Sequence, residues 1–156
     1  MKYIPDRNSP TLGLSYAIYH LVTKMRLTTI QAIRATGCED LTLEQYELLF
    51  VLFHNNGIYQ RQISKLLLKD RSNISRMLNI LEKKKLILKK SHKENKKIVE
   101  IYITELGKQL VYLLTPIKNT CGENFLKNFS EDEMAVLQKL VDKMSQNAEG
   151  LYTISI

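Results

Sequence analysis

Residues 60–104 read QRQISKLLLKDRSNISRMLNILEKKKLILKKSHKENKKIVEIYIT, and two changes of pattern divide this stretch into three parts. The first part, QRQISKLLL, places apolar residues at helical spacing and predicts a short helix with Ile63, Leu66 and Leu67 facing inward. The second part predicts a longer helix over residues 71–84, because its apolar residues recur three and four positions apart. A short turn separates the two helices, which is the arrangement of a helix-turn-helix.

The third part predicts a hairpin of two strands. LILKK and IVEIYIT are rich in β-branched residues, and the second alternates partly at period two. The loop between them, SHKENKK at residues 91–97, has no apolar residue and would form the tip of a wing. The predicted fold class is therefore mainly α with a small β-hairpin: a winged helix-turn-helix flanked by further helices.

Helices are predicted on both sides of this lobe. Residues 11–37 carry apolar side chains on more than one side, which indicates either a subunit interface or a central core helix. We expect residues 1–156 to form a single domain, with a winged lobe over 42–104 and further helices over 105–148. Pro116 is expected to kink or split the first of these later helices.

Two capping boxes predict where helices begin. Thr42 with Gln45 opens one helix, Ser130 with Glu133 opens the last, and Asp70 is the expected N-cap of the helix over 71–84. Gly57 ends the helix that Thr42 opens, because glycine adopts a positive φ without steric cost.

Positive charge is concentrated in the middle of the chain. Residues 60–97 hold 13 Lys plus Arg and three acidic residues, a net charge of +10. Residues 1–59 carry five charges of each sign, and residues 98–156 sum to −3. Charge that serves only solubility would be spread out, whereas a localised basic block is typical of a protein that binds a polyanion.

The helix predicted over residues 71–84 has two chemically different faces. One face is apolar, and the other combines hydroxyl, amide and guanidinium groups. Arg can bond guanine bidentately, Asn can pair with adenine, and Ser reaches phosphate or base. An ordinary solvated face is the competing interpretation, although alternating Glu and Lys would be more usual there. The residues predicted to contact DNA from this helix are Arg71, Ser72, Asn73, Ser75, Arg76, Asn79 and Lys83.

Lysines continue from the end of this helix into the hairpin. The helix dipole and the protection of an edge strand account for some of them, and a solvated loop is the alternative for the tip. A basic hairpin can also follow a phosphate backbone or enter a minor groove. The hairpin residues predicted to contact DNA are Lys89, Lys90, His92, Lys93, Asn95, Lys96 and Lys97. In a helix-turn-helix the first helix crosses the backbone, so Gln60, Arg61 and Lys65 are predicted to contact phosphates.

Motifs of catalysis, metal binding and secretion are absent from the sequence. There is no glycine-rich phosphate loop, HExxH or GxSxG, so we expect neither an enzyme nor a protein with a metal or cofactor. Cys38 and Cys121 show no paired spacing, which fits a reduced compartment and leaves a redox role open. The longest apolar run, LLFVLF, is too short for a membrane span and no signal sequence precedes it, so a soluble, cytoplasmic protein is expected.

With these residues in view, the sequence resembles the multiple antibiotic resistance regulator (MarR) family over about residues 12–148. The matching stretches are LTLEQYELLFVLF, QISKLLLKDRSNISRMLNILEKKKLI and ITELG. The last is similar to the family's Leu-Thr-x-x-Gly after the wing, here Ile103, Thr104 and Gly107. The family often has Gly where Lys85 stands, so this corner either turns differently or holds a Lys in the left-handed conformation.

The resemblance implies how this protein would bind DNA. It implies a homodimer formed through helices in 11–37 and 105–148, on a palindromic operator with half-sites about one helical turn, ~34 Å, apart. The helix over 71–84 would enter the major groove and the wing would reach the minor groove or backbone. The family's wing commonly carries Asp-x-Arg, where this chain has Asn95 and Lys97, which lack the ion pair and the planar fork.

The resemblance also implies regulation by a ligand. Members mostly repress transcription and many release DNA when a small, often phenolic, anion binds between the dimer helices and the winged lobe. Tyr16, Tyr19 and His20 are candidates to line that crevice, with plain interface packing as the alternative. The family's organic hydroperoxide sensors carry a Cys early in the first helix, and this sequence has none there.

Other interpretations remain open from the sequence. The winged helix could bind an acidic protein partner, or it could bind DNA without sequence preference. A helical protein that binds or converts a small molecule, with lysines serving only solubility, is a further alternative. A steep salt dependence would exclude that last alternative, and sequence competition would separate the others.

Overall fold

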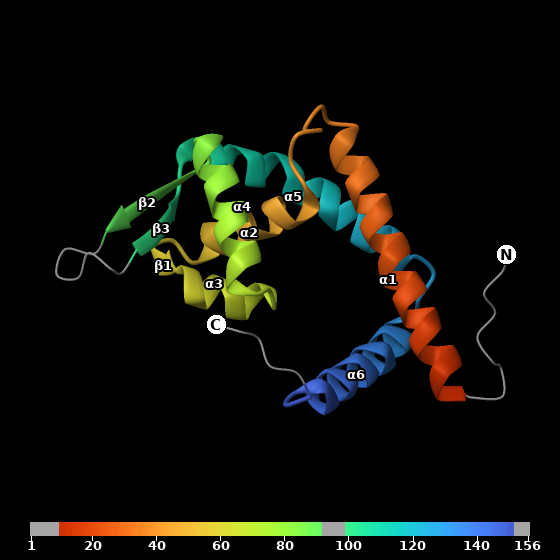
Figure 1. Ribbon diagram of the computed structural model, residues 1–156. Helices are drawn as coiled ribbons and strands as arrows, with labels where there is room; N and C mark the ends of the chain where they lie inside the picture. Colours follow the sequence, from red (N-terminus) through yellow and green to blue (C-terminus); the bar gives the residue numbers. More distant parts are fainter. Residues whose placement is uncertain (1–9, 92–98, 152–156) are drawn as a thin grey trace, which may run out of the picture.

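The computed structural model describes residues 10–91 and 99–151, and over these ranges the chain is mostly helical (Figure 1). The predicted fold class is confirmed: a winged helix-turn-helix lobe lies between helices that precede and follow it. The elements in chain order are α1 (Pro10–Arg34), α2 (Leu43–His54), β1 (Ile58–Tyr59), α3 (Gln60–Leu67), α4 (Arg71–Lys83), β2 (Ile87–Ser91), β3 (Val99–Ile103), α5 (Glu105–Phe125) and α6 (Glu131–Ala148).

Both predicted capping boxes are confirmed. The Thr42 hydroxyl accepts a hydrogen bond from the backbone of Gln45, whose side chain accepts one from the backbone of Thr42. Ser130 and Glu133 make the same reciprocal pair at the start of α6. Gly57 has the predicted positive φ, +81°, although α2 itself already ends at His54 with Asn55 as its C-cap.

The core of the lobe forms where α2, α3, α4 and the sheet meet. Apolar side chains from each element are excluded from solvent there, and α5 and the end of α1 add a few more. The largest fully buried side chains are Tyr46, Ile33, Leu48, Leu49, Leu52, Ile63, Ile74, Leu78, Leu81, Ile87, Ile101 and Leu114. This core fixes the orientation of α4, because Ile74, Leu78 and Leu81 bury one side of that helix.

The sheet has three strands where the sequence predicted a hairpin of two. Its order is β1-β3-β2 and both pairings are antiparallel, with Ile58 opposite Ile101. The added strand, β1, is only two residues long, so no alternation of side chains marks it in the sequence. It is created by tertiary contact, since the backbone N–H of Gly57 donates to the carbonyl of Ile101 at 2.9 Å.

The prediction that Leu66 faces inward is wrong. Its side chain is 56% exposed, whereas Ile63 is buried and Leu67 is partly buried against the core. The buried side of α3 runs through Ile63, Ser64 and Leu67, which places Leu66 on the flank of the helix. The small Ser64 is fully buried at an inward position of α3, and three consecutive leucines gave no indication of this.

Pro116 does not split the helix that contains it. α5 is continuous from Glu105 to Phe125, so the expected split is wrong, while the alternative of a kink at Pro116 stays a prediction. Proline removes the hydrogen bond to the carbonyl four residues earlier, which belongs to Tyr112. Tyr112 is an exposed residue, so the missing hydrogen bond falls on a part of α5 that lies at the surface.

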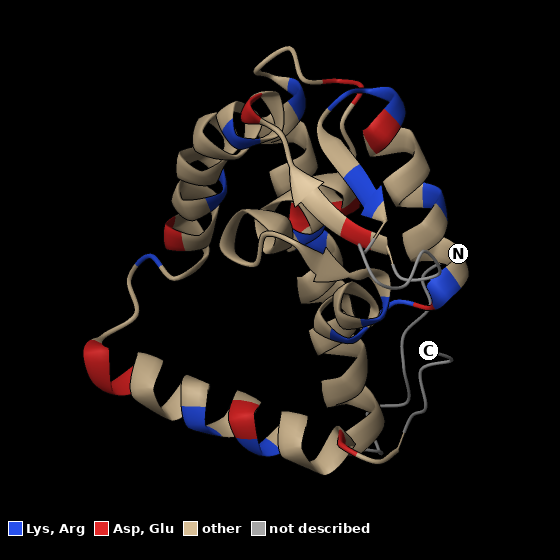
Figure 2. Ribbon diagram, turned by 90° about the vertical axis from the view of Figure 1, so that its left-hand side faces the viewer, with Lys and Arg blue, Asp and Glu red and all other residues tan. Residues whose placement is uncertain are grey.

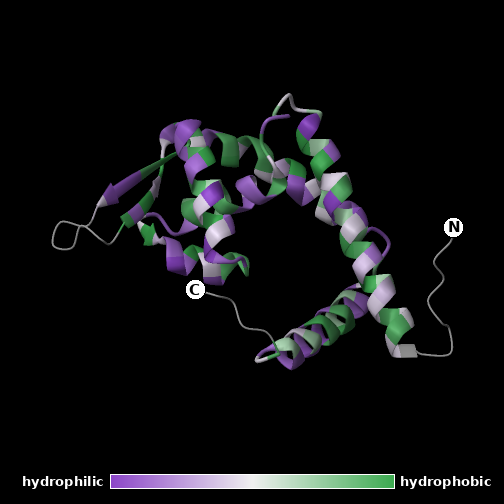
Figure 3. Ribbon diagram, in the orientation of Figure 1, coloured by the Kyte–Doolittle hydropathy of each residue, from purple (hydrophilic) through white to green (hydrophobic). Residues whose placement is uncertain are grey.

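α1, α5 and α6 extend away from the winged lobe. α1 packs along α5, while α6 projects from the end of α5 with both apolar and polar residues open to solvent (Figures 1 and 3). The exposed apolar residues of α6 are Met134, Val136, Leu137, Leu140, Val141 and Met144. None of the helices in the described ranges is long and apolar enough to cross a membrane.

Candidate nucleic-acid interface

The start of α4 is fixed by the predicted cap at Asp70. Its carboxylate accepts from the backbone N–H of Asn73 at 2.8 Å and also from the Asn73 side chain. The backbone hydrogen bond from Asn73 holds the pKa of Asp70 below its usual value. Asn73, predicted to contact DNA, therefore lies in the structure as part of the helix cap.

The outward face of α4 forms one wall of an open hollow of about 530 Å³. Six of the predicted DNA-contacting residues, five from α4 and one from α3, are brought together here, and their side chains are all polar. The residues that line it are Gln60, Arg71, Ser72, Ser75, Arg76 and Asn79. The Gln60 side chain donates to the carbonyl of Arg71 at 3.0 Å, which joins the start of α3 to the start of α4. Lys83 is exposed at the end of the helix.

Arg61 and Lys65 lie on a different part of the lobe. They line a second open hollow, of about 700 Å³, together with Tyr59 and Gln62. The Gln62 side chain accepts from the backbone N–H of Tyr59 at 2.9 Å, which fixes the entry of α3. These two cations therefore do not line the hollow on α4.

The two lysines of β2 are held by partners within the chain. Lys89 Nζ donates to the side chains of Asn79 and Glu82, at 2.6 and 2.7 Å. Lys90 Nζ lies 4.8 Å from the centre of the Tyr102 ring. The Tyr102 hydroxyl in turn donates to Glu100 at 2.7 Å, and this bond raises the pKa of Tyr102.

Sequence reasoning missed the partners of these lysines. They come from other secondary-structure elements, so no local spacing indicates them. The remaining predicted wing residues, His92, Lys93, Asn95, Lys96 and Lys97, lie outside the described residues.

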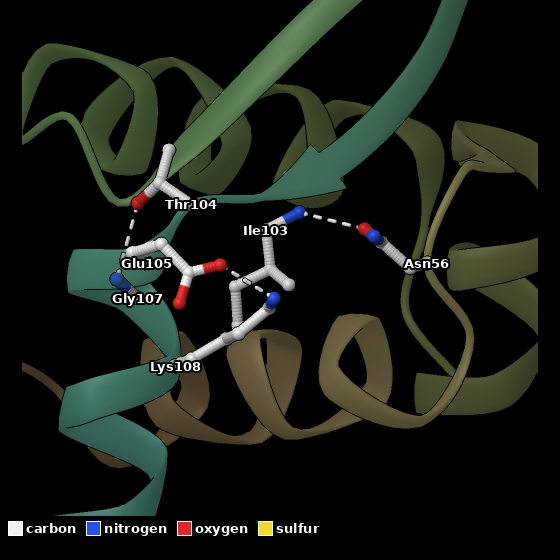
Figure 4. A network of polar contacts seen from close by, with 6 residues as sticks. All are labelled: Asn56, Ile103, Thr104, Glu105, Gly107 and Lys108. Atoms are coloured by element: carbon white, nitrogen blue, oxygen red, sulfur yellow. Dashed lines mark hydrogen bonds and ion pairs between the residues drawn. The ribbon is translucent and has the colours of Figure 1, made fainter.

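At the corner between α4 and β2, the second of the two expectations for Lys85 is confirmed. Lys85 has a φ of +59°, so a lysine does adopt the left-handed conformation there. Its backbone N–H donates to the Glu82 carbonyl at 2.9 Å, and its own carbonyl accepts from the Thr104 hydroxyl at 2.9 Å. The same hydroxyl accepts from the backbone N–H of Gly107 at 3.1 Å (Figure 4). Thr104 thus connects the end of the candidate recognition helix to the start of α5.

The candidate effector residues form an aromatic group on α1, away from α4. The rings of Tyr16 and His20 lie 4.3 Å apart, and those of Tyr19 and His20 lie 5.8 Å apart. Tyr19 and His20 are exposed and Tyr16 is partly buried. These contacts are as compatible with interface packing as with a ligand site.

A second aromatic group, which sequence reasoning missed, joins α2 to α5. The rings of Phe53 and Tyr112 meet edge to face at 5.1 Å, and His54 contacts Phe50 and Phe53. Lys118 Nζ lies 5.4 Å from the centre of the buried Tyr46 ring and 5.7 Å from that of Phe50. Burial raises the pKa of Tyr46, whose hydroxyl is 3.0 Å from that of Thr115.

Charge is distributed unevenly over the molecule. Acidic and basic residues are interspersed along α6 (Figure 2). In α3, α4 and β2, by contrast, the charged residues are mostly Lys and Arg. Among the described residues, no group of three or more His, Cys, Asp or Glu is placed to hold a metal ion. The chemistry of this surface is that of hydrogen-bond donors and cations on a rigid helix, which suits an anionic polymer.

Comparison with known proteins places these features in one family. The sequence model of the MarR family matches residues 41–99. YybA of Bacillus subtilis (strain 168), an uncharacterized HTH-type transcriptional regulator, is 31% identical over 110 residues, which cover 70% of this chain and 73% of the relative.

Two solved structures with DNA share the fold. One is of a protein from Listeria monocytogenes that is described as a MarR family transcriptional regulator, complexed with 26mer DNA. Its TM-score is 0.76, its sequence identity is 28%, and the match covers 95% of this chain and 90% of that chain. The other is the S. aureus MepR–DNA complex, with a TM-score of 0.78 and 26% identity over 89% of this chain and 99% of that chain.

Proposed function

Because the chain belongs to the MarR family of transcriptional regulators, we propose that it acts as a homodimer that binds a palindromic DNA operator, represses transcription, and is released by a small-molecule ligand. α4 would enter the major groove, and the hairpin of β2 and β3 would lie at the minor groove or the backbone. The family and its fold are those of DNA-binding regulators and not of enzymes.

The polar face of α4 is the observation that supports this proposal most directly. Ser72, Ser75 and Asn79 are short, so the backbone of α4 can approach the floor of a groove, while Arg76 can reach a base edge. The opposite face of the helix is fully buried, so the orientation of this surface is set by the core. Preorganisation of this kind reduces the entropy lost on binding.

The proposal is tested by selecting bound fragments from a random DNA duplex pool at two salt concentrations. A dimeric regulator is expected to enrich a palindrome with half-sites about one helical turn apart. Salt-sensitive binding without an enriched sequence would support the architectural alternative, and no binding at low salt would support a protein partner.

Two variants separate base contacts from phosphate contacts. Arg76→Ala is expected to lose about 1–3 kcal/mol of binding free energy and to relax the preference at one base pair per half-site. Lys65→Ala, on the exposed side of α3, is expected to weaken all sequences alike and to flatten the salt dependence by about one phosphate contact. An unchanged sequence profile for Arg76→Ala would remove this residue from base contact.

The proposed dimer is supported by the apolar side chains of α6. These exposed residues recur at helical spacing, and α1 carries further exposed ones such as Leu14, Leu21 and Val22. A second copy of the chain would cover both groups. Leu140→Glu is expected to shift sedimentation toward the monomer, whereas the control Lys139→Glu, which also adds negative charge to α6, is expected to keep the dimer.

The proposed effector is a small anion or phenol that binds near Tyr16, Tyr19 and His20. His20 lies between two tyrosine rings, so it offers a hydrogen-bonding group at the edge of an apolar surface. Titrating a panel of phenolic anions into the protein–operator complex tests this, with release of DNA as the expected result. His20→Ala should then raise the concentration needed for release without changing operator affinity. Equal release from wild type and His20→Ala would exclude this site.

A further inference from the structure

Asn79 lies on the outward face of α4, but its side-chain amide is already engaged by β2. Lys89 Nζ donates to Asn79 Oδ1 at 2.6 Å and to Glu82 Oε2 at 2.7 Å. Glu82 follows Asn79 by three residues, so one turn of α4 presents both acceptors to a single ammonium group. The Lys89 side chain is 23% exposed and that of Glu82 is 43% exposed, so the lysine is the better covered partner. We call these three side chains the Glu82–Lys89–Asn79 clamp.

The ammonium group determines which end of the Asn79 amide faces β2. An ammonium group only donates hydrogen bonds, so it selects the amide oxygen and leaves the NH₂ group on the far side. Asn79 also lines the hollow on α4 beside Ser75 and Arg76. The groups that remain for a ligand at this end of the hollow are therefore mainly donors: the Asn79 NH₂ and the Arg76 guanidinium.

This arrangement conflicts with the adenine contact that the sequence suggested for Asn79. Asn pairs with adenine by accepting from the N6 amino group and donating to N7, which requires the amide oxygen. Here a positive charge lies against that oxygen and repels a second donor. Guanine presents two acceptors, N7 and O6, on the same edge of the major groove.

From this geometry we infer that the Glu82–Lys89–Asn79 clamp makes Asn79 select guanine over adenine at one position of each operator half-site. This inference rests on the proposed function, because it concerns how the same surface reads DNA. Glu82 is a positioning residue: its carboxylate holds Lys89 against Asn79 and keeps that ammonium group from a phosphate. Without Glu82, Lys89 is free to contact the backbone, which adds affinity for every sequence and reduces selectivity.

The test compares selections from the random duplex pool for the full-length wild type and four variants. Asn79→Ala identifies the position that Asn79 reads, because the base preference there disappears. At that position the wild type should show guanine, and Lys89→Met should lower the ratio of guanine to adenine by about tenfold. Lys90→Met is the matched control for losing a charge from β2, since Lys90 is the next residue and lies over the Tyr102 ring. Any loss of affinity in this variant should be common to all sequences, so the ratio of guanine to adenine should stay unchanged.

Glu82→Ala provides an independent measurement. It should tighten binding to all sequences, steepen the salt dependence by about one phosphate contact, and lower the guanine preference. Thermal unfolding followed by circular dichroism should place all the variants close to the wild type, because the clamp lies at the surface.

Three results would overturn the inference. An enriched operator with adenine at the Asn79-dependent position would do so, as would an unchanged base ratio in Lys89→Met. Both of these results would leave the proposed function intact. If the wild type enriched no sequence at all, the proposed function would fail, and the inference would fail with it.

Discussion

Replacing Gly107 by alanine should disrupt the junction between the winged lobe and α5. Gly107 is the third residue of α5, and its backbone N–H donates to the Thr104 hydroxyl that caps this helix (Figure 4). A β-carbon at this position would lie 2.3 Å from the carbonyl oxygen of Leu86 and 2.7 Å from Ile103 Cγ1. Leu86 is buried between α4 and β2, so its carbonyl cannot move away without moving one of them.

The expected loss of stability follows from these contacts. Overpacking of this kind costs about 1–3 kcal/mol. The Leu86 carbonyl also accepts from the backbone N–H of Thr104 at 3.0 Å, and losing that bond adds roughly 1 kcal/mol. Alanine recovers about 0.5–1 kcal/mol over glycine through its helix propensity. The net decrease in the free energy of unfolding should therefore be about 1–3.5 kcal/mol.

Urea denaturation at a fixed protein concentration measures this change, because a dimer unfolds in a concentration-dependent manner. Gly122→Ala is the control, since Gly122 lies in the same helix and a β-carbon there meets nothing within 4 Å in this chain. That variant should be as stable as the wild type or gain about 0.5–1 kcal/mol. Equal stabilities for Gly107→Ala and Gly122→Ala would refute the close approach to Leu86. Operator affinity should fall in Gly107→Ala alone, because the shifted carbonyl lies at the exit of α4.

Three further predictions concern stability. Ser64→Ala should raise the free energy of unfolding by about 1 kcal/mol, because the buried Ser64 hydroxyl has no hydrogen-bond partner within the described chain; a clear loss in urea denaturation would contradict this. Lys85→Gly should raise the free energy of unfolding by roughly 0.5–1 kcal/mol. A left-handed φ costs a residue with a β-carbon about 1–2 kcal/mol, and glycine removes this cost, but the greater freedom of glycine in the unfolded chain offsets part of the gain. The pKa of Glu44 lies below its usual value, because burial raises it but hydrogen bonds from its own backbone and from Arg26, with the charge of Arg26, outweigh that effect. The ion pair with Arg26 thus stabilises the fold at pH values above the ordinary carboxyl pKa, and this stabilisation is lost as the pH falls through the lowered pKa of Glu44. Glu44→Gln should therefore cost a few tenths of a kcal/mol of unfolding free energy at pH 7 and almost nothing at about pH 3. Urea denaturation at both pH values measures the difference.

The features that the sequence predicted correctly depend on neighbouring residues. The capping boxes at Thr42 and Ser130 and the cap at Asp70 each involve residues three positions apart, so spacing alone identifies them. The buried side of α4 follows from helical periodicity in the same way. The left-handed Lys85 was anticipated only because the resembling family often has glycine at that position.

The features that the sequence missed depend on residues far apart in the chain. β1 exists because Ile58 pairs with Ile101, and two residues carry no periodic signal. The exposure of Leu66 follows from how α3 packs in the lobe, which buries Ile63 and Ser64 instead. The roles of the wing lysines beyond Ser91 and of the effector candidates on α1 remain predictions.

The sequence by itself determined the order of the elements, the positions of the helix starts, the polar face of α4 and the concentration of positive charge in residues 60–97. Each of these arises from short-range spacing or from composition, so no knowledge of the fold is needed to find it. Only the tertiary structure decided which atoms of that polar face are free. Lys89 reaches Asn79 and Glu82 because β2 packs beside α4, and the close approach of Gly107 to Leu86 requires α5 to start at the same corner. Hydrogen bonding and steric exclusion act over a few ångströms in space, and residues that the chain separates come within that distance only in the folded protein.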